Sequence, residues 1–217
     1  MKLVKFAPIH CAAISVFLFA ALSAQAGTTW DGGGTPNPDG SYNWEDKANW
    51  GGSAPPRYSG GLAEFPEGVT LSMYIATDYF PSLTQCNKVV IPSSSTITLT
   101  SDDPAVAGMQ INKLEDLSGA LILDGKVKVY LNSAALTGLN VTAQNGATLQ
   151  TPANAVISGV NFTIESGATY VANTIKQLMG GSSITVSGST MTGSLSSNAA
   201  HDGSVVITGF PPADCGI

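Results

Sequence analysis

Acidic residues stand in adjacent pairs at two places, and paired carboxylates can supply the acid and the base that cleave a glycosidic bond. The pairs are Asp102–Asp103 and Glu115–Asp116, with Asp124 a little further along the chain. Asp102, Asp103 and Asp124 would form a site only if the fold brought them to one face. Two Asp residues before a proline, here Pro104, are also typical of a turn. The sequence therefore favours a protein that is not an enzyme, and we predict no catalytic residues.

The other candidates for catalysis or metal binding are few. His201 precedes Asp202 in a Gly/Ser-rich stretch, which is more typical of a solvated turn than of a catalytic pair. Cys86 and Cys215 are distant from each other and offer no zinc-ligand spacing. The calcium-binding Gly-Gly-x-Gly-x-Asp repeat is also missing from the sequence. We predict no metal site and no cofactor.

All three tryptophans lie near the start of the chain, and exposed indole rings can stack on sugars. They alternate with short polar residues suited to bonding hydroxyl groups, in the order Trp30, Asp31, Asn43, Trp44, Asn49, Trp50. Trp30, Trp44 and Trp50 are therefore our candidates for glycan-binding residues. The structural alternative is a hydrophobic cap, in which the polar residues bond free backbone groups. We favour the cap, because large aromatic side chains are mostly buried.

The segments that would position these residues repeat along the chain. Asn140–Leu149 aligns with Asn161–Tyr170, twenty-one residues later, and Val141 matches Phe162. Gly125 and Gly146 have the same separation. Looser copies of the unit are Thr96–Thr100, Leu121–Val129, Ser183–Met191 and Val205–Thr208. Each unit reads as a strand, a Gly or Asn turn, a second strand and a loop.

A unit this short cannot bury its apolar side alone, whereas stacked units share one interior. The sequence therefore predicts an all-β fold, a right-handed parallel β-helix (solenoid) with an N-terminal aromatic cap. An antiparallel sandwich or barrel is the alternative, but neither fold requires matched residues at a near-constant spacing. In a solenoid, Cys86 and Cys215 would lie about 30 Å apart along the axis, so we expect no disulfide between them.

The N-terminus has the three features of a cleaved export signal. Lys2 and Lys5 supply positive charge, Cys11–Leu22 is apolar, and Ala24-Gln25-Ala26 places small residues at a cleavage site. The apolar stretch is short for a membrane anchor, so we expect no membrane span after cleavage. The predicted organisation is a signal peptide at 1–26, a cap segment at 27–65 and solenoid coils at 66–217. The predicted location is secreted or on the cell surface.

The charge of the chain argues against nucleic-acid partners. The formal net charge is −6 for the whole chain, and it becomes −8 when Lys2 and Lys5 leave with the signal. The remaining cations are scattered, whereas binding to nucleic acid needs clustered cations that displace counterions.

The motifs of the cap segment resemble a known family. Trp30-Asp31-Gly32-Gly33, Asn49-Trp50 and the Pro55-Pro56 loop are similar to the opening of exported β-solenoid proteins with autotransporter-associated β-strand repeats. The resemblance covers Trp30 to about Phe65 and implies a passenger-like solenoid, although we recognise no translocator barrel after the coils. The expectation is a non-enzymatic structural or adhesion-type protein, and the alternative is a carbohydrate-binding or glycan-active β-helix protein. Expected partners are an extracellular glycan or another copy of the chain.

Overall fold

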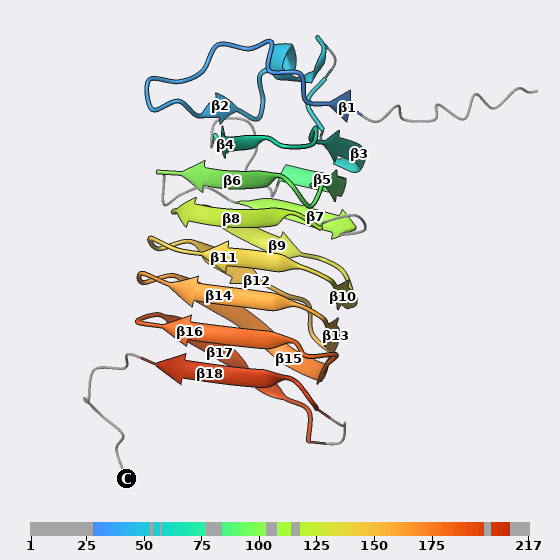
Figure 1. The fold of residues 1–217 in the computed structure, drawn as a ribbon, viewed down its shortest axis with the longest axis vertical. Helices are drawn as coiled ribbons and strands as arrows, with labels where there is room; N and C mark the ends of the chain where they lie inside the picture. The colour runs from blue at the N-terminus through green and yellow to red at the C-terminus, as the bar shows by residue number, and fades with distance from the viewer. Residues whose placement is uncertain are drawn as a thin grey trace, which may run out of the picture.

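The computed structural model describes residues 28–52, 54–56, 58–76, 84–102, 108–113, 118–197 and 201–208. Their strands all pair in parallel and wind into a stack of coils, so the predicted solenoid is confirmed (Figure 1). The described residues contain one short helical segment, the 3₁₀ turn η1 (Lys47–Trp50). The predicted signal peptide lies outside the described residues, as do Arg57, Asp103, Glu115–Asp116 and Cys215.

Strands from successive coils line up in two sheets on opposite sides of the stack. The eight-stranded sheet contains β2 (Tyr42–Asn43), β4 (Thr70–Tyr74), β6 (Thr96–Ser101), β8 (Ala120–Gly125), β11 (Asn140–Ala143), β14 (Asn161–Glu165), β16 (Ser183–Ser187) and β18 (Ser204–Thr208). The ten-stranded sheet contains β1 (Thr28–Thr29), β3 (Tyr58–Glu64), β5 (Thr84–Val90), β7 (Met109–Lys113), β9 (Lys128–Leu131), β12 (Thr148–Gln150), β15 (Thr169–Met179) and β17 (Thr190–Leu195), with β10 (Ala135–Thr137) and β13 (Ala155–Ser158).

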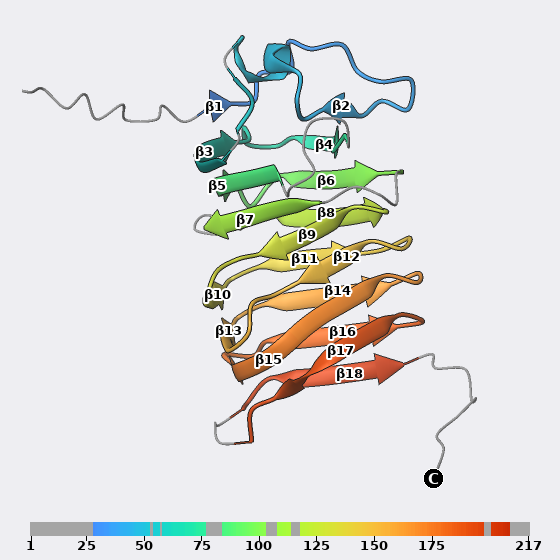
Figure 2. The same ribbon diagram turned by 180° about the vertical axis from the view of Figure 1, so that it is seen from behind.

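The winding is right-handed. Strands of the eight-stranded sheet run from right to left on the near side of the stack in Figure 1, and β7, β9 and β15 of the other sheet do the same when the molecule is turned around in Figure 2. The chain descends from β1 and β2 at one end to β17 and β18 at the other. A path that moves left on the near side while it descends is a right-handed helix.

The register of the sheets confirms the repeat. Val141 of β11 lies beside Phe162 of β14, and Phe162 lies beside Ile184 of β16. The spacing is less regular upstream, because Leu121 of β8 lies beside Val141 and Ile97 of β6 lies beside Leu121. The coils before residue 120 are therefore longer than the repeat predicted from the later coils.

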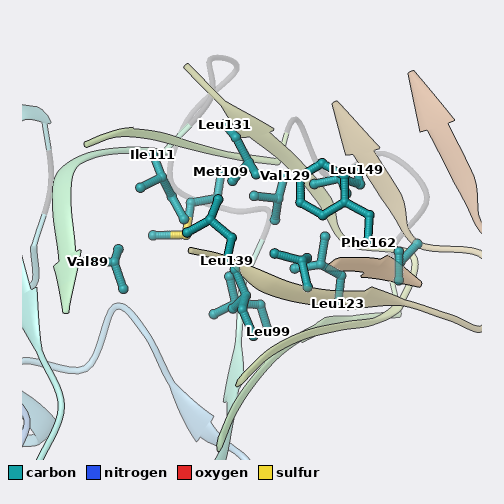
Figure 3. Close-up of a cluster of buried hydrophobic side chains, with 14 of the residues drawn as sticks. Val89, Leu99, Met109, Ile111, Leu123, Val129, Leu131, Leu139, Leu149 and Phe162 are labelled. Carbon is teal, nitrogen blue, oxygen red and sulfur yellow. The ribbon is translucent and has the colours of Figure 1, made fainter. Parts of the chain in front are cut away.

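Alternate residues of each strand point inward and fill the space between the sheets. In Figure 3, Val129 and Leu149 of the ten-stranded sheet lie across from Leu123 and Phe162 of the eight-stranded sheet. All four side chains are at most 1% exposed. A continuous apolar interior of this kind is the main source of stability for a solenoid.

Two turns that join the sheets use left-handed backbone. Asn145–Gly146 and Ser166–Gly167 occupy equivalent places in consecutive coils, and all four residues have positive φ angles between 53° and 91°.

The strand β15 bends at Asn173, which has left-handed backbone with φ 52°. The second half of β15 pairs with β13, which pairs with β10, so the later coils have a short third side that the repeat did not predict.

Candidate functional site

Trp44, Trp50 and Phe65 pack against one another near the first coils. The centroids of the Trp44 and Trp50 rings are 5.0 Å apart, and the Phe65 ring lies 6.3 Å from Trp44 and 5.8 Å from Trp50. The Trp50 Nε1–H donates to the Trp44 carbonyl at 2.8 Å, and the Trp44 Nε1–H donates to the Pro56 carbonyl at 3.2 Å. Both indole N–H groups are therefore paired, as buried indoles require. We call Trp30, Trp44, Trp50 and Phe65 the aromatic cap.

Short polar side chains hold the backbone of this segment, as the cap interpretation predicts. The Asn49 side chain accepts from the Gly34 N–H at 3.0 Å and donates from Nδ2 to the Asn43 carbonyl at 2.9 Å. The Asp46 carboxylate accepts from the Ala48 N–H at 2.9 Å and so caps η1. These bonds satisfy backbone groups that no strand pairs.

The burial of the aromatic cap bears directly on the three glycan candidates. Trp44 is 0% exposed and Trp50 is 1% exposed, so neither ring offers a face to a sugar. Trp30 is half-buried, and its ring meets the edge of Tyr42 at 5.4 Å. A platform of three exposed tryptophans therefore does not form, because two of the rings complete the hydrophobic interior.

The cap segment is also part of the coiled stack. β1 pairs with β3, and β2 pairs with β4, in the same parallel sense as the later strands. Within the predicted cap segment, 27–65, the strands β1, β2 and β3 therefore belong to the two sheets.

An open depression lies beside the aromatic cap, and sequence reasoning missed it. Its volume is about 320 Å³, and its lining residues are Asn37, Pro38, Asp39, Asn43 and Tyr74. Asp39 accepts from both the N–H and the hydroxyl of Ser41, and these bonds lower the pKa of Asp39. The depression thus combines an aromatic side chain, two amides and a carboxylate, which is the chemistry that recognises hydroxyl groups. The Pro-Asp-Gly turn at Pro38 was its one visible signal.

The two acidic candidates that the structure describes, Asp102 and Asp124, each accept a structural hydrogen bond. The Asp102 carboxylate accepts from the Tyr74 hydroxyl, whereas the Asp124 carboxylate accepts from Gln144 Nε2 at 3.2 Å and Asn145 Nδ2 at 2.6 Å. Among the described residues, no group of three or more His, Cys, Asp or Glu side chains could hold a metal ion.

His201 also differs from its predicted role as a solvated turn residue. Its Nδ1 accepts from the Leu178 N–H at 3.1 Å, and its Nε2 lies 2.9 Å from the Ser196 carbonyl. An Nδ1 that accepts leaves the proton on Nε2, so the neutral ring bonds both groups at once. His201 therefore joins β15 to the loop that follows β17.

The outer surface of the eight-stranded sheet carries aligned polar residues. Asn161 Nδ2 donates to Asn140 Oδ1 at 3.0 Å, and the Ser183 hydroxyl donates to Asn161 Oδ1 at 2.8 Å. Two residues further along each strand, Thr142, Thr163 and Thr185 align in the same way. We call this surface the hydroxyl–amide face; its members are Asn140, Thr142, Asn161, Thr163, Ser183 and Thr185.

Comparison with protein-family models, with curated proteins and with solved structures finds no match for this chain. The resemblance of the cap segment to autotransporter-associated repeats therefore stands as a likeness of fold, without a family assignment. In the part of the chain that the structure describes, no helix has the length and apolar character needed to cross a membrane.

Proposed function

We propose that this chain is an exported, non-enzymatic structural protein of the adhesion type, which acts outside the cell or on its surface. Two observations support the proposal. The interior is filled by apolar side chains, and the side chains of Asp102, Asp124 and His201 are engaged in structural hydrogen bonds. The N-terminal sequence supports export, and we expect the exported chain to begin at Gly27.

The hydroxyl–amide face is the surface that we expect to bind the partner. Its residues present hydroxyl and amide groups at the strand spacing of about 4.8 Å, coil after coil. None of its six members is charged. An uncharged, hydroxyl-rich polymer can meet such a face with many weak hydrogen bonds at once, and repeated weak contacts add up through multivalency. A neutral surface polysaccharide is the partner class that fits.

Lysine substitutions on the two sides of the stack test this function. In the variant Thr142→Lys/Thr163→Lys, two charges interrupt the hydroxyl–amide face. The matched control, Thr148→Lys/Thr169→Lys, places the same charges on the outer side of β12 and β15. We expect the native chain to bind at least one insoluble neutral polysaccharide in a pull-down, the first variant to lose about tenfold or more in affinity, and the control to bind normally.

Two results would overturn an adhesive role for the hydroxyl–amide face. If no polysaccharide or cell surface retains the native chain, or if both variants bind alike, the face has no adhesive role. Release of shortened sugar products by the native chain would instead establish an enzyme.

A second candidate, carbohydrate binding at one defined site, is favoured by the open depression. Asn37, Asp39 and Asn43 line it together with the aromatic side chain of Tyr74. Soluble oligosaccharides would bind there, and Asn37→Ala/Asp39→Ala would remove that binding without affecting the hydroxyl–amide face. Titration calorimetry with short oligosaccharides separates this site from the face, which needs a polymer.

A further inference from the structure

The two ends of the described stack differ in how they meet solvent. At the N-terminal end, the edge strands β1 and β2 have two residues each, and η1 lies over the coils (Figure 1). The rings of Trp44 and Trp50 are buried at this end. At the other end, β17 has six residues and β18 has five, and each pairs with a neighbour on one side only. Short or covered edges resist pairing with other chains, whereas long bare edges invite it.

Exposed apolar side chains gather on this second end. The large hydrophobic residues exposed in the described part of the chain are Leu195 at 43%, Val206 at 46% and Ile207 at 44%. Ile207 occupies the inward position that Val186 fills in β16, where Val186 is fully buried. Among the described residues, no coil follows β18 to cover Ile207.

Within the described residues, one edge of β18 has no strand beside it. The Ser204 N–H donates to the Ser182 carbonyl, and the Thr208 carbonyl accepts from the Gly188 N–H, so both residues direct their backbone groups toward the preceding coil. Since backbone direction alternates along a strand, Val205 and Ile207 direct their N–H and C=O groups away from β16. Unpaired groups of this kind gain stability from a partner.

The chemistry of β18 indicates what kind of partner fits. Its sequence, Ser-Val-Val-Ile-Thr, has no charge and no proline, the two devices that usually protect an exposed edge. Two copies of β18 are also complementary when they run antiparallel with Val206 at the centre, because apolar residues then face apolar residues and hydroxyl residues face hydroxyl residues. Val205 then lies opposite Ile207 of the partner subunit, and Ser204 lies opposite Thr208 of the partner subunit.

We propose that the β18 edge pairs with the same edge of a second copy, giving a two-fold dimer joined at this end. Val205 and Ile207 would form hydrogen-bonded pairs across the junction, because their backbone groups already point outward. Both side chains lie on the inward side, so the apolar interior would continue from one copy into the other. Val206 would meet Val206 of the partner subunit on the outer surface.

The aromatic cap explains why the assembly closes at two copies. A head-to-tail contact would place β18 against the covered N-terminal end and would grow into a filament. A two-fold contact uses the bare end of both copies and leaves only capped ends exposed. The dimer is independent of the proposed adhesive role, since the hydroxyl–amide face lies on the side of the stack.

The mass of the full chain in solution tests the dimer. We expect sedimentation equilibrium to give twice the mass of one chain at micromolar concentration. Val206→Lys places two like charges opposite each other at the two-fold axis and should raise the dissociation constant about 100-fold or more. Thr185→Lys, in the same outward column one coil earlier, is the matched control and should remain dimeric.

A second variant guards against misfolding. Ile207→Pro removes an N–H that faces away from β16, so it should abolish the dimer while leaving the circular dichroism spectrum unchanged. A monomeric native chain, a filament, or a dimer that survives both Val206→Lys and Ile207→Pro would overturn the proposal. If deletion of residues 209–217 turns a monomeric chain into a dimer, that segment covers the edge instead, and the proposal also fails.

Discussion

At the scale of single residues, Cys86 is a nucleophile that the fold makes inert. Its side chain is 0% exposed, and its Sγ–H lies 3.4 Å from the Gly61 carbonyl and 3.2 Å from the Lys88 carbonyl. Burial raises the pKa of the Cys86 thiol to about 12, since a thiolate inside the stack would lose its hydration. The thiol therefore serves packing rather than chemistry.

The raised pKa predicts a loss of stability at alkaline pH. The unfolded chain releases the Cys86 proton above its ordinary pKa of 9.0, whereas the folded chain keeps it until about 12. The contribution of Cys86 is thus present below pH 9 and is lost as pH rises toward 12. Between pH 8 and pH 10.5, we expect the native chain to lose roughly 2 kcal/mol more unfolding free energy than Cys86→Ala.

Urea denaturation at the two pH values measures this difference. Comparison with Cys86→Ala cancels the titration of tyrosines and lysines, which both proteins share; among them is Tyr170, whose pKa burial also raises to about 12. Equal losses in both proteins would show that Cys86 does not carry the effect.

At the scale of elements, the repeated strands and turns could be predicted because each depends on local pattern. Alternation of polar and apolar residues indicated the strands, and the matched pair Val141 and Phe162 indicated their stacking, which the register confirms. The burial of Trp44 and Trp50 could not be decided in the same way. An aromatic residue looks the same in a cap and in a binding platform, and only tertiary packing separates the two.

The third side of the later coils was missed for a related reason. β10 and β13 are only three and four residues long, and no hydrophobic period can be recognised over so short a segment. The depression near Tyr74 was missed because its lining comes from a loop, from β2 and from β4, and β4 is far from the other two in sequence. Long-range contacts of this kind leave no local signature.

The turn at Ser166 yields a prediction at this scale. Ser166 has φ 53° and precedes Gly167, whereas the equivalent turn one coil earlier uses Asn145, which tolerates this backbone better. Ser166→Asn should therefore raise the unfolding free energy by about 0.5 kcal/mol. The measurement is the urea midpoint of the variant against that of the native chain.

The control for this turn is Ser187→Asn, one coil later. Ser187 pairs with Glu165 and is not among the residues with positive φ, so the same substitution should bring no gain there. A gain of equal size in both variants would mean that asparagine stabilises the surface generally, and that the left-handed backbone is not the cause.

At the scale of the whole molecule, the stack behaves as a nearly one-dimensional object. Every described strand pairs only with strands of the coil before it or the coil after it, and β10, β13 and β15 on the third side follow the same rule. Such proteins are stabilised by the interfaces between neighbouring coils. All three tryptophans lie between residues 30 and 50. Tryptophan fluorescence therefore measures unfolding at the N-terminal end of the stack alone.

A cavity in the middle of the stack should therefore separate the behaviour of its two ends. Phe162 is fully buried and its ring meets Tyr170 at 5.5 Å, so Phe162→Ala should cost about 3–5 kcal/mol at that interface. In the native chain, we expect tryptophan fluorescence and far-ultraviolet circular dichroism to give one urea midpoint. In Phe162→Ala, the dichroism midpoint should fall at least about 0.5 M below the fluorescence midpoint.

This separation follows from the position of the cavity. Coils after Phe162 lose their interface with the capped coils and unfold first, whereas the coils under the aromatic cap keep their own contacts. Thr163→Ala removes an outward side chain next to Phe162 and should leave both midpoints in place. If the two midpoints fall together in Phe162→Ala, the coils are too strongly coupled to unfold separately, and the stack is a single cooperative unit from the aromatic cap to β18.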